Sequence, residues 1–260
     1  MLAFACQLDI VWKKPAENLR KIERTLANLA PPSSSLVVFP EMATTGFTME
    51  LMGLAEPPSG PVESRLAAIA EEHGIYLVAG LAVASSMAAK PSNQLLTFSP
   101  AGEIVSRYTK LHPFSLLGEQ HALLPGDSID TFEIAGIQTS PFICYDLRFP
   151  EVFRQAAAAG AQLFIVAANW LEYRHDHWIT LARARAIENQ AFVIAVNRVG
   201  SDPDHRYLGG STIIGPCGTV LATAGATEQS ISAEISPETV ENHRSELPFL
   251  ADRRTLTPQL

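Results

Sequence analysis

The stretch QTSPFICYDLRFPE, residues 138–151, joins an apolar segment, a cysteine and a proline-led helical segment. The apolar residues before Cys144 predict the end of a buried strand. Pro150 suits the first position of a helix, which Gly160 then ends. Cys144 therefore lies at a strand-to-helix turn, where backbone N–H groups and the positive helix end favour a thiolate and can hold an oxyanion. Most cysteines are small buried hydrophobes, so this stretch alone leaves a structural role open.

The composition indicates a cytoplasmic protein with one large core. With 260 residues and 47% hydrophobic side chains, we expect one domain over residues 1–260. A net charge of −8 offers no basic field for nucleic acid or an anionic membrane. Cys6, Cys144 and Cys217 are too few for a disulfide framework and favour a reducing compartment. The first residues predict a strand rather than a signal peptide, and no run reaches the ~18 apolar residues of a membrane span.

Strands alternate with helices at both ends of the chain, and paired strands are expected in the middle. The expected strands are 2–8, 36–39, 75–83, 93–98, 103–108, 129–134, 137–143, 162–168, 191–196 and two or three within 209–233; the expected helices begin at 15, 61, 150, 176 and 237. Continuous apolar strands predict sheets covered on both faces. We therefore expect two similar halves packed sheet on sheet, with helices outside. Residues 109–128 lack periodicity and predict a long functional loop.

Three ionisable side chains each follow an apolar strand or an extended segment: Glu41, Lys110 and Cys144. A carboxylate or an ammonium is costly to bury alone, but buried together they offset one another. Taken singly, Glu41 could be a loop carboxylate and Lys110 a solvated surface lysine. Lys110 is, however, the last lysine of the chain and opens the long loop.

Five strings cover nearly the whole chain in a fixed order: VVFPEMATTGF (37–47), YTKLHPF (108–114), ICYDLRFPE (143–151), AANW (167–170) and RARAIENQAFV (183–193). In that order and spacing they resemble the nitrilase superfamily of carbon–nitrogen hydrolases. Together with NRVG and GGST…GPCG they are most similar to its omega-amidase-like branch. The resemblance implies an α/β fold, a four-layer α-β-β-α sandwich. Pro113 replaces a common leucine but does not affect Glu41, Lys110 or Cys144. The loop of residues 173–175 varies with substrate in the family, so the resemblance leaves the substrate open.

The resemblance also implies roles for individual residues. Glu41 would be the general base, Lys110 the cation at the oxyanion and Cys144 the nucleophile. The chemistry agrees, because amide hydrolysis by a thiol needs a base and donors for a tetrahedral oxyanion. The backbone N–H of Tyr145 would share the oxyanion with Lys110, and Glu119 would hold Lys110 or position water.

The same five strings contain the candidate substrate-binding residues. Phe47, Phe114 and Trp170 are expected pocket walls, although each could be core, and Asn169 precedes Trp170. Arg148 could bind a substrate carboxylate or form an ion pair with Asp146 or Glu151. His175 and His177 diverge on a helix, and we expect no metal and no cofactor.

Reactivity is expected to differ among the three cysteines. Cys144 should be the reactive thiol, its pKa lowered by Lys110 and local N–H groups. Cys217, in a Gly-Pro-Cys-Gly turn, should be inert, and Cys6 should lie in the core.

The leading functional hypothesis is hydrolysis of a small linear amide, such as the omega-amide 2-oxoglutaramate, through a cysteine thioester. N-carbamoyl amides, deaminated glutathione and nitriles are alternative substrates within the family. A Cys–His hydrolase using Cys144 with His112 or His121, and a non-catalytic assembly protein, are the alternatives of other kinds. We expect at least a homodimer, with the tail from about residue 236 packing on a partner subunit.

Overall fold

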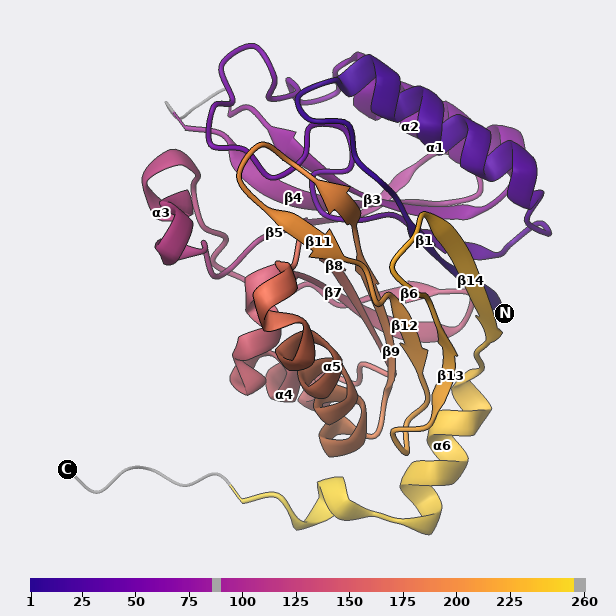
Figure 1. Ribbon diagram of the computed structural model, residues 1–260. Coiled ribbons are helices and arrows are strands. Elements are labelled where there is room, and N and C mark those ends of the chain that lie inside the picture. The colour runs from indigo at the N-terminus through magenta and orange to yellow at the C-terminus, as the bar shows by residue number, and fades with distance from the viewer. Residues whose placement is uncertain (86–89, 255–260) are drawn as a thin grey trace.

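The computed structural model describes residues 1–85 and 90–254 (Figure 1). The strands are β1 Leu2–Gln7, β2 Leu36–Val38, β3 Tyr76–Val83, β4 Ser92–Phe98, β5 Ile104–Thr109, β6 Phe132–Ile134, β7 Ile137–Ile143, β8 Leu163–Ala168, β9 Phe192–Asn197, β10 Val199–Ser201, β11 Arg206–Leu208, β12 Thr212–Ile214, β13 Val220–Thr223 and β14 Gln229–Glu234. The α-helices are α1 Pro15–Leu29, α2 Pro61–His73, α3 Glu119–Ala122, α4 Pro150–Ala158, α5 His175–Asn189 and α6 Pro237–Glu246. Short 3-10 turns cover Ser115–Leu117, Cys144–Arg148, Glu172–Arg174 and Phe249–Asp252.

Two large mixed sheets with matching topology form the centre of the described chain. The first has the strand order β14-β1-β2-β3-β4-β5 and the second β13-β12-β9-β8-β7-β6. Each has three neighbouring parallel strands, β1-β2-β3 in one and β7-β8-β9 in the other, flanked by antiparallel strands. The expectation of two similar halves is therefore confirmed.

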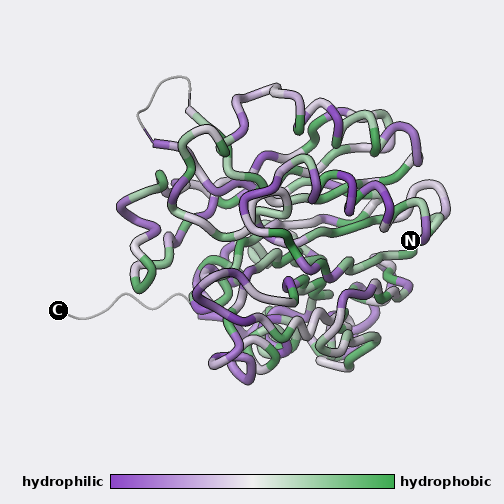
Figure 2. The backbone as a smooth tube through the Cα atoms, turned by 45° about the horizontal axis from the view of Figure 1, so that its top comes forward, coloured by the Kyte–Doolittle hydropathy of each residue, from purple (hydrophilic) through white to green (hydrophobic). Residues whose placement is uncertain are grey.

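The layers follow from side-chain alternation along the strands. In β2, Leu36 and Val38 face the second sheet, whereas Val37 faces the layer that contains Ile22 of α1 and Leu66 of α2. Helices α4 and α5 cover the outer face of the second sheet. Figure 1 shows the pair α1 and α2 on one side of the molecule and the pair α4 and α5 on the other. Figure 2 shows the apolar strands inside and mixed polarity along the outer helices. The predicted α-β-β-α sandwich is confirmed.

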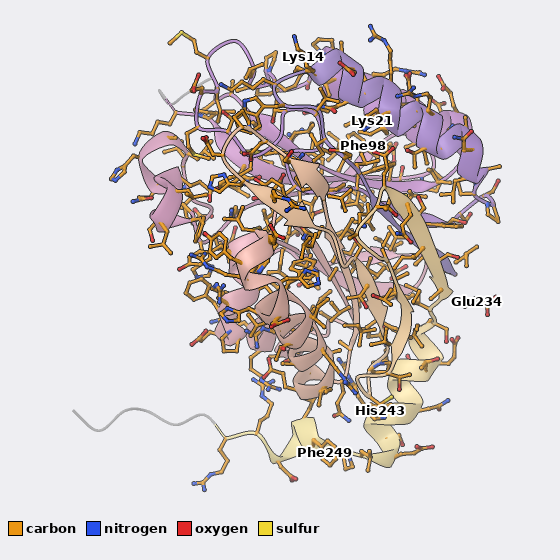
Figure 3. The ribbon with its side chains drawn as sticks, viewed as in Figure 1. Lys14, Lys21, Phe98, Glu234, His243 and Phe249 are labelled. Atoms are coloured by element: carbon orange, nitrogen blue, oxygen red, sulfur yellow. The ribbon has the colours of Figure 1, made fainter. Side chains whose placement is uncertain are left out.

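The C-terminal helix is anchored on its own chain. Val240 of α6 is buried, and Arg244 donates to the carbonyl oxygens of Ala161, Asn189 and Gln190. Beyond α6, Phe249 is 60% exposed, and it lies with His243 at the end of the molecule opposite α1 (Figure 3). The last residues of the tail, 255–260, fall outside the described part of the chain.

Two elements differ from the sequence-based expectation. The long loop 109–128 contains a 3-10 turn at Ser115–Leu117 and the short helix α3. Helix α3 is too short for its hydrophobic pattern to repeat. The hairpin of β10 and β11 was also not expected. Each of these strands has three residues, which is too few to show a clear alternation of apolar and polar side chains.

Candidate active site

The three predicted triad residues meet where strands of the two sheets end. Glu41 lies three residues beyond β2, Lys110 directly follows β5 and Cys144 directly follows β7. β2 and β5 belong to the first sheet and β7 to the second. Asn169, which follows β8 of the second sheet, donates its backbone N–H to Glu41 Oε2 at 2.8 Å. The sheet-on-sheet packing thus brings together groups that are far apart in sequence.

The ammonium of Lys110 lies between two carboxylates. Its Nζ is 2.9 Å from Glu41 Oε1 and 2.8 Å from Glu119 Oε2, and the exposed fraction of each side chain is at most 1%. Burial disfavours the ammonium, but the charges of Glu119 and Glu41 outweigh this, so that the pKa of Lys110 lies above its usual value. Lys110 is therefore a fixed positive charge, and its interpretation as a solvated surface lysine is wrong.

Two asparagines fix the orientation of the Glu41 carboxylate. Asn93 Nδ2 donates to Glu41 Oε1 at 2.7 Å and to Glu119 Oε1 at 3.0 Å, and it thereby links the two carboxylates. Asn169 Nδ2 donates to the backbone oxygen of Glu41 at 2.7 Å. Asn93 had no signal in the sequence, because it lies inside the β4 strand pattern and its partners Glu41 and Glu119 are 52 and 26 residues away.

The absence of a side chain at Gly80 of β3 lets the Glu41 segment lie close to the sheet. A Cβ at this position would lie 2.5 Å from the backbone nitrogen of Met42 and 2.6 Å from Glu41 Cα. The segment pairs with Gly80 from both sides, since Gly80 N–H donates to Pro40 and Ala43 N–H donates to Gly80. Any side chain at position 80 would displace Glu41.

Cys144 occupies the strained turn between β7 and α4 that the sequence predicts. Its φ of +47° is in the left-handed region, which is unfavourable for a residue with a Cβ. The 3-10 turn Cys144–Arg148 follows, and α4 begins at Pro150. Asp146 Oδ2 accepts the backbone N–H of Ile143 at 3.0 Å and closes the turn.

The protonation state of Cys144 differs from expectation. Burial raises the pKa of this thiol, and the Glu41 charge raises it further, while Lys110 and the backbone N–H of Asn169 only partly oppose them. The predicted lowering of its pKa is wrong, because the Lys110 charge is already shared between two carboxylates. Cys144 therefore rests as a thiol and needs a base to become a nucleophile.

The other two cysteines also differ from one another. Cys6 is fully buried in β1, as expected. Cys217 is exposed, and its contact with Thr219 Oγ1 lowers the pKa of its thiol. Exposure and a lowered pKa both favour a reactive thiol, whereas the sequence predicts an inert one, and labelling decides between them.

A narrow pocket opens beside Cys144. Its walls combine aromatic and aliphatic side chains with a few polar groups, and all five predicted substrate-binding residues are among them. The lining residues are Phe47, Phe114, Leu117, Cys144, Tyr145, Arg148, Asn169, Trp170, Leu171 and Arg174. Leu117 and Leu171 were not identified from the sequence, because nothing in their local pattern separates them from core leucines.

Two arginines of the pocket lack a carboxylate partner. The guanidinium of Arg148 lies 4.7 Å from the centre of the Trp170 ring, and that of Arg174 lies 5.2 Å from the Phe114 ring. Neither forms an ion pair within the described chain; Asp146, an expected partner of Arg148, is instead bound by Tyr108 and His112. Burial and the Arg174 charge lower the pKa of Arg148. Two mutually repelling cations at one pocket favour an anionic ligand.

The remaining candidates do not join the Cys144 site. His112 Nδ1 lies 2.8 Å from Asp146, His121 is exposed, and neither lines the pocket. Over residues 1–85 and 90–254, no three His, Cys, Asp or Glu side chains gather as a metal site would require. No helix in those same ranges has the length and apolar character to cross a bilayer.

Known proteins share this sequence pattern and fold. The family model of carbon–nitrogen hydrolases matches residues 2–245. The chain is 38% identical to the 2-oxoglutaramate amidase of Bacillus subtilis, over 95% of both proteins, and 35% identical to the omega-amidase YafV of Yersinia enterocolitica, over 95% of this chain and 94% of that protein. The structure of XC1258 from Xanthomonas campestris, a CN-hydrolase superfamily protein with an arsenic adduct in its active site, superposes with a TM-score of 0.92 at 31% identity, covering 100% of this chain and 99% of that one. The chain accordingly belongs to the carbon–nitrogen hydrolase family of the nitrilase superfamily, hydrolases of non-peptide C–N bonds.

Proposed function

We propose that this hydrolase is a thiol-dependent amidase that converts the omega-amide of a short dicarboxylic acid, such as 2-oxoglutaramate, to the carboxylate and ammonia. The observation that carries the proposal is the buried Lys110 ammonium bound by Glu41 and Glu119, next to Cys144 at a pocket where two guanidiniums form no ion pair within the described chain. A binding or assembly protein has no need of such a cluster, because burying three charges gains little stability by itself.

In the first half-reaction, Cys144 Sγ attacks the amide carbonyl carbon as Glu41 takes the thiol proton. The carbonyl oxygen becomes an oxyanion, which Lys110 and the backbone N–H of Tyr145 stabilise. Collapse of the tetrahedral intermediate breaks the C–N bond, and Glu41 returns its proton to the departing nitrogen. Ammonia leaves, and the acyl group stays on Cys144 as a thioester.

In the second half-reaction, water attacks the thioester with Glu41 again as the base. The oxyanion forms at the same donors, and collapse releases the carboxylic acid and restores the thiol. Glu119 is the second carboxylate that holds Lys110, and its Oε2 also accepts the backbone N–H of Phe114. Glu119 therefore supports the position of the ammonium through both steps.

The substrate class follows from the pocket. Arg148 and Arg174 offer forked donors for the distal carboxylate, a geometry that lysine does not match. The aromatic rings beside them hold each guanidinium from one face. The combination of apolar walls and two cations suits a short acid chain, and both relatives named above are called amidases.

Ammonia release from a substrate panel tests this proposal. 2-Oxoglutaramate and succinamate should be hydrolysed with higher kcat/KM than propionamide, a nitrile or an N-carbamoyl compound, and deaminated glutathione provides a longer acyl chain for comparison. Propionamide turned over better than succinamate would contradict the carboxylate requirement. Hydrolysis of the nitrile alone would contradict amidase activity.

Two further proposals concern the state of the protein. Its three free thiols support a reducing, cytoplasmic location. The exposed Leu247 and Phe249 support self-association as a dimer or larger assembly, with the part of the tail beyond α6 on a partner subunit. Light scattering at micromolar concentration should give at least twice the monomer mass of 28.1 kDa, and a monomer would contradict this proposal.

A further inference from the structure

A fully buried carboxylate that the mechanism above does not use lies two residues beyond Cys144. Asp146 Oδ1 accepts the backbone N–H of His112 at 3.0 Å and lies 2.8 Å from His112 Nδ1. Asp146 Oδ2 accepts the Tyr108 hydroxyl at 2.7 Å and the backbone N–H of Ile143 at 3.0 Å. Each oxygen thus has two partners, as many as a carboxylate oxygen can take.

These partners come from the two segments that carry the oxyanion groups. Tyr108 and His112 lie two residues on either side of Lys110, and Ile143 directly precedes Cys144. One carboxylate therefore binds both flanks of the lysine segment and the start of the cysteine turn.

Ring contacts reinforce the same connection. The His112 ring stacks on Phe149, which ends the 3-10 turn, with centroids 3.8 Å apart and planes 10° apart. The Tyr108 ring meets Phe142 of β7 edge to face at 5.9 Å. The lysine segment is thus held to the cysteine turn at both of its flanks.

The strained backbone of Cys144 makes this connection consequential. A left-handed residue with a Cβ persists only where its surroundings determine it. The bond from Ile143 N–H to Asp146 Oδ2 spans the turn that imposes this φ. If the bond is lost, Cys144 and the N–H of Tyr145 can relax relative to Lys110.

We propose that Asp146 is a positioning residue that sets the separation of Lys110 from the Cys144 turn, and so assembles the oxyanion site. This inference rests on the proposed function, in which Lys110 and Tyr145 N–H stabilise the oxyanion. Asp146 does not touch the substrate; it acts through the two segments it binds.

Asparagine at position 146 is a sharp test because its shape matches aspartate. Its side chain has one acceptor oxygen and one donor NH₂ group. The Tyr108 hydroxyl and His112 Nδ1 can reverse their roles, but the backbone N–H groups of Ile143 and His112 cannot. Whichever way the amide is turned, one of these two N–H groups faces another donor.

The experiment compares amide turnover with thiol reactivity in a Cys217→Ser background, which removes the exposed thiol. The readouts are kcat for succinamate and the rate at which methyl methanethiosulfonate modifies Cys144. The reagent lacks a carbonyl, so its reaction forms no oxyanion. Val152→Ala, on α4 just beyond the turn, is the control for loss of stability without loss of the carboxylate.

We expect Asp146→Asn to lower kcat by ~10²-fold, the effect of an ångström of misplacement, with KM and the modification rate changed less than about 3-fold. His112→Ala removes the ring contact with Phe149 and the Nδ1 contact with Asp146, and it retains the backbone bonds. It should lower kcat about 5- to 10-fold by partial misplacement, and it provides the test if Asp146→Asn does not fold. Val152→Ala should lower the melting temperature and leave kcat nearly unchanged.

Three results would overturn the inference. The first is parental kcat in Asp146→Asn, or in His112→Ala if only that variant folds. The second is an equal fall of kcat and the modification rate, which would place the effect on the thiol. The third is a Val152→Ala variant that loses as much kcat at an equal loss of stability. Turnover by the parent is measured first. Absence of ammonia release from any amide contradicts the proposed function and this inference with it, whereas turnover that survives the substitutions contradicts the inference alone.

Discussion

Replacing Lys110 by arginine separates the shape of the cation from its charge. Lys110 Nζ is held 2.8–2.9 Å from one oxygen of each glutamate, with almost no exposure to solvent. A guanidinium is planar, larger and directs its donors in a fork, so it cannot occupy the same point between Glu41 and Glu119. Its extra atoms must displace one carboxylate or the oxyanion by about 1 Å, a misplacement that costs ~10²-fold in rate. The loss of one oxyanion donor costs a similar ~10²–10³-fold.

The substitution should also lower stability, because the site has no room for a larger side chain. Overpacking a buried position costs about 1–3 kcal/mol, or roughly 2–10 °C in melting temperature for a chain of this size. Lys110→Met is the matched charge control. It leaves Glu41 and Glu119 without their cation, and breaking a buried ion pair from one side costs about 3–5 kcal/mol.

The assay is kcat for succinamate together with thermal unfolding of the parent, Lys110→Arg and Lys110→Met. We expect a kcat fall of at least ~10²-fold for arginine and the larger loss of melting temperature for methionine. An arginine variant that retains more than about a third of parental kcat would refute the reasoning, since the shape of the cation would then be irrelevant to the oxyanion site.

Three further predictions concern thiols, substrate and pH. Sub-stoichiometric iodoacetamide should label Cys217 before Cys144. The reason is that the Cys217 thiol is exposed and its pKa is lowered, while the pKa of Cys144 is raised. Peptide mapping locates the label, and a first label on Cys144 would contradict the prediction. Arg148→Leu should raise KM for succinamate by ~10–100-fold, the effect of a charge-assisted hydrogen bond, and change KM for propionamide little; equal changes for both amides would exclude carboxylate recognition by Arg148. The free energy of unfolding should fall as pH rises from 9 to 12, because burial raises the pKa of Cys6 from 9.0 to about 12, so the unfolded chain loses this proton first. Cys6→Ala should reduce that slope by up to ~1.4 kcal/mol per pH unit, and urea titrations showing the same slope in both proteins would disprove this assignment.

The resting thiol of Cys144 gives Glu41 a defined part in the proposed cycle. A cysteine that is already ionised would react with any small electrophile that enters the pocket. A buried thiol of raised pKa instead ionises as its proton passes to Glu41. Glu41 is therefore the group that activates Cys144 in the proposed cycle.

Much of the fold could be predicted because its causes are local. The stripe of α1, the apolar run of β2 and the proline at the start of α4 each depend on residues within a few positions. The short helix α3 and the β10–β11 hairpin were not predicted, because elements of three or four residues are too short for a period to repeat.

The sequence by itself determined the alternation of strands and helices, the turn at Cys144 and, through its strings, the family. Only the tertiary structure decided which polar groups meet. Asn93 and Asn169 bind Glu41 from 52 and 128 residues away, and Asp146 is taken by Tyr108 and His112 rather than by Arg148. It also reversed the expected pKa shift of Cys144 and exposed Cys217. The physical reason is that propensity and periodicity act along the chain, whereas desolvation and charge act through space and depend on everything that packing places nearby.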